Sequence, residues 1–169
     1  FTLAELARLA GEDRRPPVER WNPAHCGDSF MRIASDGTWY HEGRPIAREG
    51  LVRLFSSILR REPDGSFVLV TPVEKLAIAV DDAPFVAVEM KSEGEGRERN
   101  LAFRINTGEV VIAGPEHELR LDGERPYLEI RRGLDAVLAR PVYYELAEIG
   151  LDEGGAWSGG LFFRFGAAA

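Results

Sequence analysis

The segment LVTPVEKLAIAVDDAPF, residues 69–85, decides the fold that we predict. Two apolar, β-prone runs, 68–70 and 76–80, are separated by the letters TPVEK. Short apolar runs that are bounded by turn residues are typical of buried strands. Pro72 has no amide donor and a fixed φ angle, so the chain must break its strand there. The segment therefore predicts two strands with a charged pair at a forced break.

The charged pair, Glu74 and Lys75, has two interpretations. Neighbouring side chains of a strand point to opposite faces, so the two charges need not pair with each other. In one interpretation the proline only forces a polar turn, and both charges are solvated. In the other, the break carries at least one of them into a cleft between two apolar units, because clefts of this kind often hold ligands. We keep both interpretations.

Upstream of this segment the pattern is helical at first and strand-like later. A capping box and apolar residues at helical spacing predict a short helix over residues 2–11. The charged, proline-rich stretch 12–23 is expected to be a linker or an extended strap. From Ser29 onward, β-prone runs flank Asp36-Gly37, which is the strongest hairpin signal in the chain.

One strong helix and several strands follow in the pattern. Residues 48–61 place apolar side chains on one face at spacings of three and four, which predicts a helix of about four turns. No later segment shows a comparable helical pattern. The polar stretch 91–100 is interpreted as a long hairpin loop. Six further strands are expected at 85–90, 101–105, 109–113, 127–130, 142–149 and 161–165.

The composition is that of an ordinary globular protein. The 169 residues are 44% hydrophobic and 29% charged, which is enough apolar material for a large core. The net charge of -7 repels nucleic acid and acidic membranes. No apolar run approaches the roughly 20 residues that span a bilayer, and no leader sequence is visible. We expect a cytoplasmic protein without nucleic-acid or membrane partners.

The sequence offers little for catalysis or metal binding. The single cysteine, Cys26, excludes an internal disulfide, and we interpret it as a buried or half-buried structural thiol rather than a nucleophile beside His25. The three histidines lack metal-binding spacing, and Asp81-Asp82 is more typical of a solvated turn than of a cation site. We therefore predict no catalytic residue, no metal and no cofactor.

A faint repeat indicates two related units. Arg-Ile, a turn glycine and a second glycine six residues later occur at 32–43 and again at 104–114. The segments FVLVTPVEKL and YLEIRRGLDAV then share a strand, a polar break and a further apolar run. Chance likeness between hairpins is the alternative, because hairpins share turn chemistry.

Two long segments, CGDSFMRIASDGTWYHEGRPIAREGLVRLFSSILRRE and DGSFVLVTPVEKLAIAVDDAPF, closely resemble a bacterial family of uncharacterised proteins, domain of unknown function 1285. The later segment YLEIRRGLDAVLARPVYYELAEIG resembles it less strongly. The resemblance implies an α+β fold of two strand-rich units with internal duplication, the second similar to a pleckstrin-homology barrel. We expect a helix and strap over 1–23, an α+β unit over 24–82 and a β-rich, barrel-like unit over 83–169.

The resemblance also implies a small-molecule site between the units, with a nucleotide-like molecule as a candidate ligand, and a role in signalling. No phosphate-binding glycine loop is present, so side chains and turn amides would hold the anion. Arginines of the second half offer planar forks for phosphate or carboxylate. Surface arginines at strand ends more often only pack their alkyl chains on the protein and keep the charged group in water. The predicted ligand-binding residues are Thr71, Glu74, Lys75, Arg131, Arg132, Arg140 and Tyr143.

Three function classes remain open at this point. We rank a non-catalytic binding or regulatory protein for a small anionic ligand first, because no catalytic constellation is visible. A protein-interaction module comes second and a hydrolase third. The oligomeric state is not predicted.

Overall fold

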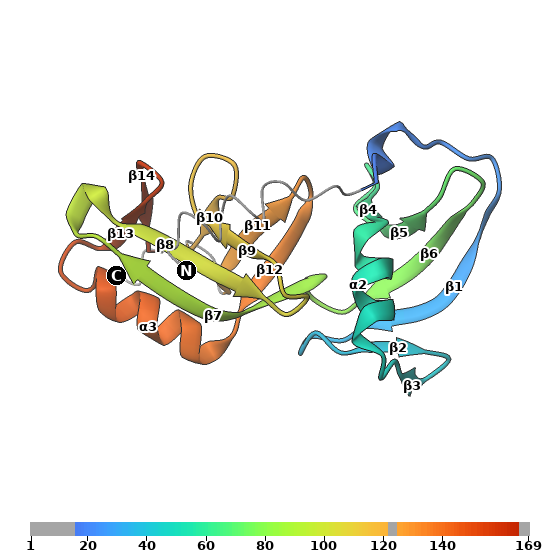
Figure 1. Ribbon diagram of the computed structural model, residues 1–169, viewed down its shortest axis with the longest axis horizontal. Helices are drawn as coiled ribbons and strands as arrows, with labels where there is room; N and C mark the ends of the chain where they lie inside the picture. The colour runs from blue at the N-terminus through green and yellow to red at the C-terminus, as the bar shows by residue number, and fades with distance from the viewer. Residues whose placement is uncertain (1–15, 122–124, 166–169) are drawn as a thin grey trace. The chain divides into compact units, whose positions relative to one another are not determined.

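The computed structural model describes residues 16–121 and 125–165 (Figure 1). They form two compact units. Among these residues, the N-terminal unit contains 16–84 together with Arg132–Leu134, and the C-terminal unit contains 85–121, 125–131 and 135–165. The helix predicted over residues 2–11 lies outside the described residues.

The N-terminal unit is a mixed sheet with one α-helix. Its sheet has the order β3-β2-β1-β6-β5-β4, in which the central strands β1 and β6 are parallel. The other neighbours in the sheet pair antiparallel. Its elements are η1 (Val18–Arg20), β1 (Cys26–Ile33), β2 (Trp39–His41), β3 (Arg44–Pro45), α2 (Glu49–Ser57), β4 (Leu59–Arg61), β5 (Phe67–Val70) and β6 (Lys75–Val80).

The hairpin predicted at Asp36-Gly37 is confirmed, and the two strands predicted on either side of Pro72 form a second hairpin. β1 and β2 pair across the Asp36-Gly37 turn, where Gly37 has the positive φ of 90° that such a turn requires. β5 and β6 pair across the TPVE turn, with Val70 directly opposite Lys75. The strand break at Pro72 is therefore a reversal of the chain within one sheet.

The helix predicted over 48–61 is too long. α2 ends at Ser57, and the next residues form strand β4 against β5. The hydroxyls of Ser56 and Ser57 donate to the carbonyls of Arg53 and Leu54, a local bonding pattern that competes with helix continuation. Pairing with β5 then buries Leu59 completely, and this tertiary gain outweighs helix propensity.

The C-terminal unit is a second mixed sheet, with the order β10-β11-β12-β7-β8-β9, and a separate β13-β14 hairpin. Its central strands β7 and β12 are again parallel. α3 packs beside β7, as Figure 1 shows. The elements are β7 (Phe85–Glu93), η2 (Gly96–Glu98), β8 (Asn100–Ile105), β9 (Val110–Ile112), β10 (Leu119–Arg120), β11 (Tyr127–Arg131), β12 (Leu134–Leu138), α3 (Arg140–Gly150), β13 (Gly155–Ser158) and β14 (Leu161–Arg164).

The strand predicted over 142–149 is wrong, because this segment is helix α3. Pro141 lies in the first turn, where its missing amide costs the helix nothing. Val142 and Leu146, four residues apart, are both buried, while Tyr144 between them is 60% exposed. This is the burial pattern of a helix that packs on one face. The other strands expected after residue 85 are present. The hairpin loop predicted over 91–100 joins the antiparallel pair β7 and β8 but is shorter, because β7 continues to Glu93 and β8 begins at Asn100.

The two sheets have the same strand order, which establishes the internal duplication. In each unit the first strand lies beside the sixth, the first three strands follow one another to one edge, and the last three follow to the other. One of the sheets curls into a half-barrel. The FVLVTPVEKL and YLEIRRGLDAV segments form the equivalent hairpins β5-β6 and β11-β12. The Arg-Ile match instead aligns β1 with β8, which are not equivalent strands, so it is a chance likeness.

Candidate functional site

One face of the N-terminal sheet is only partly covered. We call the side that carries Lys75, Ala77 and Ala79 of β6 the open face. Both alanines are exposed, although β6 is a central strand, whereas Ile78 between them is buried. Alternation along the strand therefore places the core on the opposite side. By register, Cys26, Asp28 and Arg32 of β1 and Val68 and Val70 of β5 share the open face.

A strap covers one end of the open face. Val18 of η1 packs with Val68 and Val70 in a small apolar cluster, and Trp21 and Ile58 flank it. This strap is the extended segment predicted within residues 12–23, as far as the structure describes it. It leaves the part of the face around Lys75 and the two alanines accessible.

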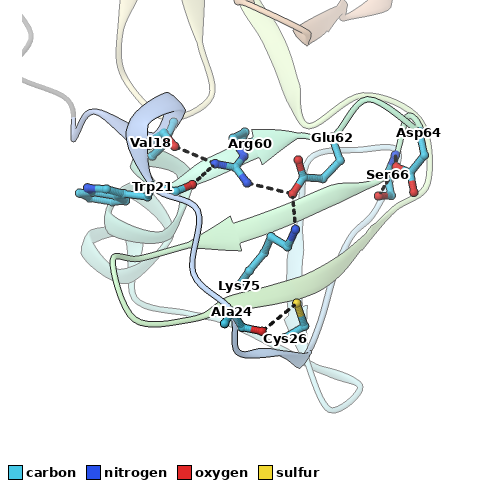
Figure 2. A network of polar contacts seen from close by, with 9 residues as sticks. All are labelled: Val18, Trp21, Ala24, Cys26, Arg60, Glu62, Asp64, Ser66 and Lys75. Carbon is cyan, nitrogen blue, oxygen red and sulfur yellow. Dashed lines mark hydrogen bonds and ion pairs between the residues drawn. The ribbon is translucent and has the colours of Figure 1, made fainter.

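Three charged side chains, Arg60, Glu62 and Lys75, meet at the border of the strap (Figure 2). Arg60 Nη1 donates to the carbonyls of Val18 at 2.8 Å and Trp21 at 2.6 Å, so it fastens the strap to the sheet. Arg60 Nη2 lies 2.9 Å from Glu62 Oε1, and Lys75 Nζ lies 3.1 Å from the same oxygen. All three side chains are largely buried, with Lys75 the most exposed at 27%.

The cluster carries an excess of positive charge. Burial raises the pKa of Glu62, but hydrogen bonds and charge attraction from Arg60 and Lys75 outweigh it, so this pKa lies below its ordinary value. Glu62 is therefore ionised at neutral pH, and two cations share one carboxylate. The Lys75 ammonium has three donors, and Glu62 is its one side-chain partner among the described residues. It retains donors for a further acceptor.

Cys26 lies next to this cluster and is exposed, contrary to the prediction of a buried or half-buried thiol. It is the register partner of Lys75 across the parallel pair. Its Sγ lies 3.8 Å from the Ala24 carbonyl. Figure 2 draws this contact beside the cluster. The physical reason for its exposure is its place at the start of β1 on the open face, beyond the strap.

Two other predicted residues of this unit, Thr71 and Glu74, shape the turn before Lys75. The Thr71 hydroxyl accepts from the Glu74 amide at 3.1 Å and the Val73 amide at 3.3 Å. The Thr71 amide in turn donates to the Glu74 carbonyl at 2.9 Å. Thr71 thus holds the turn closed, and Glu74 is half-buried at its end.

The predicted residues of the second half lie on two elements. Arg131 ends β11 with its guanidinium 5.2 Å from the centre of the Phe85 ring, and Arg132 is exposed in the following turn. Arg140 is exposed at the start of α3, and Tyr143 is half-buried one turn later. Each unit thus holds its own part of the predicted set, and the ligand site predicted between the units stays a prediction.

Arg60 and Glu62 were missed by the sequence reasoning. Both lay in or just after the predicted long helix, where they resembled solvated residues of a last turn. The signal that could have found them is strand alternation, because Arg60 is flanked by Leu59 and Arg61 on the opposite face.

The described ranges, 16–121 and 125–165, lack two features, a metal-binding cluster and a membrane-spanning helix. No group of three or more histidine, cysteine, aspartate or glutamate side chains there could hold a metal ion. In the same ranges, no helix has the length and apolarity needed to cross a membrane.

Two family models together match all the described residues. "Domain of unknown function (DUF1285), N-terminal domain" matches residues 16–83, and "Protein of unknown function (DUF1285), C-terminal domain" matches residues 84–165. No curated protein matches the chain.

Two crystal structures of DUF1285 family proteins are similar to the chain. The one from Silicibacter pomeroyi DSS-3 is 43% identical with a TM-score of 0.83, covering 99% of this chain and 96% of that chain. The one from Shewanella baltica OS155 is 27% identical with a TM-score of 0.58, covering 72% of this chain and 92% of that chain.

Proposed function

Because the chain belongs to the DUF1285 family, whose two domains are described as of unknown function, we propose its function from its own side chains. We propose a non-catalytic binding protein for a small anionic ligand, with Lys75 as the anchoring cation. A nucleotide-like ligand and a regulatory role in signalling are parts of this proposal that come from the family resemblance.

The observation that carries the proposal is the unbalanced charge of the Arg60, Glu62 and Lys75 cluster. Arg60 is engaged by two carbonyls and the carboxylate, so Lys75 is the cation of the cluster that has donors to offer. It is partly shielded from water, and an anion gains more from a partly desolvated ammonium than from a fully solvated one. A phosphate or carboxylate at Lys75 would complete the charge balance.

The surroundings of Lys75 leave room for the rest of such a ligand. Exposed Ala77 and Ala79 continue from Lys75 along the same face and present only methyl groups. On the neighbouring strand β1, Asp28 lies beside Ala77 and Arg32 beside Ala79, and Arg32 is stacked 4.8 Å from the centre of the Tyr40 ring and paired with Asp81. A flat apolar strip next to a cation suits a ligand with a planar group and an anionic end.

The test is a thermal-shift screen with nucleotides and other anionic metabolites, followed by titration calorimetry. A ligand present at about 100 times its dissociation constant adds about 2.7 kcal/mol to the stability of the protein. The Lys75→Gln variant should weaken the best ligand by about 1.5–3 kcal/mol, the usual contribution of a hydrogen bond to a charged group.

The chain offers a matched control, because Lys91 is its only other lysine. Lys91 lies exposed on β7, and Lys91→Gln removes the same charge elsewhere. Equal affinity in the Lys75→Gln and wild-type proteins would contradict the proposal, as would a screen in which no anion raises the melting temperature.

A further inference from the structure

A second group of charged residues surrounds the turn between β2 and β3. Glu42 and Gly43 form a two-residue hairpin loop, with φ angles of 51° and 83°, and His41 is directly opposite Arg44. Two positive φ angles in succession define a type I′ turn, in which an asparagine or glycine is usual at the first position. A glutamate there has a conformation that its side chain disfavours.

The turn is fixed to a second strained residue. The Glu42 amide donates to the Phe30 carbonyl at 2.9 Å, and Phe30 itself has a φ of 57°. Phe30 lies where the pairing of β1 with β6 shifts register, between Asp28 and Arg32. Such bulges re-aim neighbouring side chains, and a residue other than glycine held at positive φ is strained. Strained residues of this kind cluster at functional sites.

The turn borders a hollow of about 440 Å³, lined by His41, Glu42, Arg44, Pro45 and Ile46. This volume is within the range of about 300–1,000 Å³ that small-molecule sites occupy. His41, Glu42 and Arg44 are exposed, and none of their side chains has a hydrogen bond or ion pair with any described residue. Glu42 and Arg44 therefore offer a free carboxylate and a free guanidinium around one space.

We propose that this hollow binds a small zwitterion of the α-amino acid or dipeptide class. The planar fork of Arg44 suits a carboxylate, and Glu42 accepts hydrogen bonds from an ammonium group. Pro45 and Ile46 provide apolar surface for the remainder of the ligand. A simple anion fits less well, because the Glu42 carboxylate would repel it.

This site is separate from the one at Lys75. Tyr40 is the register partner of Arg32 on the open face, so His41, one residue further, points to the opposite side of the sheet. The two proposals consequently name different ligand charges and different faces, and either can fail without the other.

Titration calorimetry of the whole chain tests the proposal with the twenty standard amino acids and glycylglycine. Acetate and methylammonium serve as half-ligands that carry one charge each. We expect at least one zwitterion to bind saturably and both half-ligands to bind at least about tenfold more weakly, since each lacks one charged contact worth about 1.5–3 kcal/mol. Arg44→Gln and Glu42→Gln should each weaken the zwitterion by about tenfold or more.

Two controls separate binding from folding and from the other site. Arg48→Gln removes an exposed arginine between β3 and α2 that does not line the hollow, and Lys75→Gln alters the open face; both should bind the zwitterion like the wild type. If Glu42→Gln fails to fold, Glu42→Asn removes the charge with a residue that tolerates positive φ. The proposal is overturned if no zwitterion of the panel binds, if acetate binds as tightly, or if the Arg44 and Glu42 variants bind unchanged.

Discussion

The two six-stranded sheets share a strand order but differ in how their centres are covered. In the C-terminal sheet three consecutive residues are buried in each of β7, β8 and β12. Consecutive side chains point to opposite faces, so both faces are covered there. In the N-terminal sheet the central strand β6 buries Ile78 and exposes Ala77 and Ala79. The two units therefore share their topology, whereas the elements that cover their sheets differ.

The difference follows from where each unit places its helix. α2 lies between the third and fourth strands and has one buried residue, Ser56. α3 follows the sixth strand and buries Val142, Leu146 and Gly150. The C-terminal unit also adds the β13-β14 hairpin, which packs on β8 and α3. The N-terminal unit uses the η1 strap and a charge cluster in place of this second layer.

The largest expected effect is on the free energy of unfolding, when one apolar side chain is shortened in the α-helix of each unit. Leu146→Ala in α3 removes a completely buried side chain and should lower the free energy of unfolding by about 2–5 kcal/mol. Leu54→Ala in α2 removes a side chain that is 58% exposed and should change it by no more than about 0.5 kcal/mol. Denaturant unfolding followed by tryptophan fluorescence measures both. Equal losses would mean that the two helices cover their sheets alike.

The next effect concerns the cluster that fastens the strap. Glu62→Gln leaves Arg60 and Lys75 without their shared carboxylate and should cost about 1.5–3 kcal/mol at pH 7. The pKa of Glu62 is lowered by folding, so its stabilising contribution is complete above the unfolded pKa and disappears as the pH falls through the folded pKa. Unfolding of both proteins from pH 7 to pH 3 should therefore show two curves that converge in acid. A constant gap across this range would contradict the assignment.

A smaller effect tests the extra hairpin of the C-terminal unit. The completely buried Ser158 hydroxyl donates to the Ala113 carbonyl at 2.7 Å and accepts from the Leu101 amide at 2.9 Å. Ser158→Ala leaves both groups without this partner and should cost about 1–2 kcal/mol. Hydrogen exchange should report faster exchange at the Leu101 amide. Ser35→Ala, at an exposed serine of the N-terminal unit, is the control.

The smallest effect concerns ion pairs in the two sheets. Arg32 pairs with Asp81 and Arg104 with Glu89, and all four side chains are more than a third exposed. Double-mutant cycles should give each pair less than about 1 kcal/mol, declining with added salt. A larger value for the Arg32 pair alone would indicate that the open face is less accessible to water than its exposure suggests.

The sequence predicted the Asp36-Gly37 hairpin and the break at Pro72 because their signals are local. Gly37 tolerates the positive φ of a tight turn and Pro72 fixes its own φ angle, so both features follow from neighbouring residues. α3 was mistaken for a strand because VYYELAEI contains β-prone residues, although its spacing of Val142 and Leu146 also fits a helix. The end of α2 could not be predicted, since it depends on pairing with β5.

The candidate sites were less predictable than the fold. Lys75 was singled out from the break beside it, but its partner Glu62 comes from another strand and is brought close only by sheet register. The hollow beside Glu42 and Arg44 gave no sequence signal, because two adjacent positive φ angles at non-glycine and glycine residues are visible only in the backbone. A site formed by side chains of different strands depends on the register between those strands, and no local stretch of the sequence specifies that register.

The parallel pairing of the first and last strands in each unit also governs how the protein is made. Ser29 in β1 donates to the carbonyl of Ala77 in β6, 48 residues later, so the centre of the first sheet cannot form until β6 has been synthesised. The same holds for β7, which must wait for β12. Long-range pairing of this kind slows folding, and the edges of β1 and β7 that pair with β6 and β12 are exposed meanwhile. Each unit therefore emerges from the ribosome as open hairpins and becomes a domain only with its final strand.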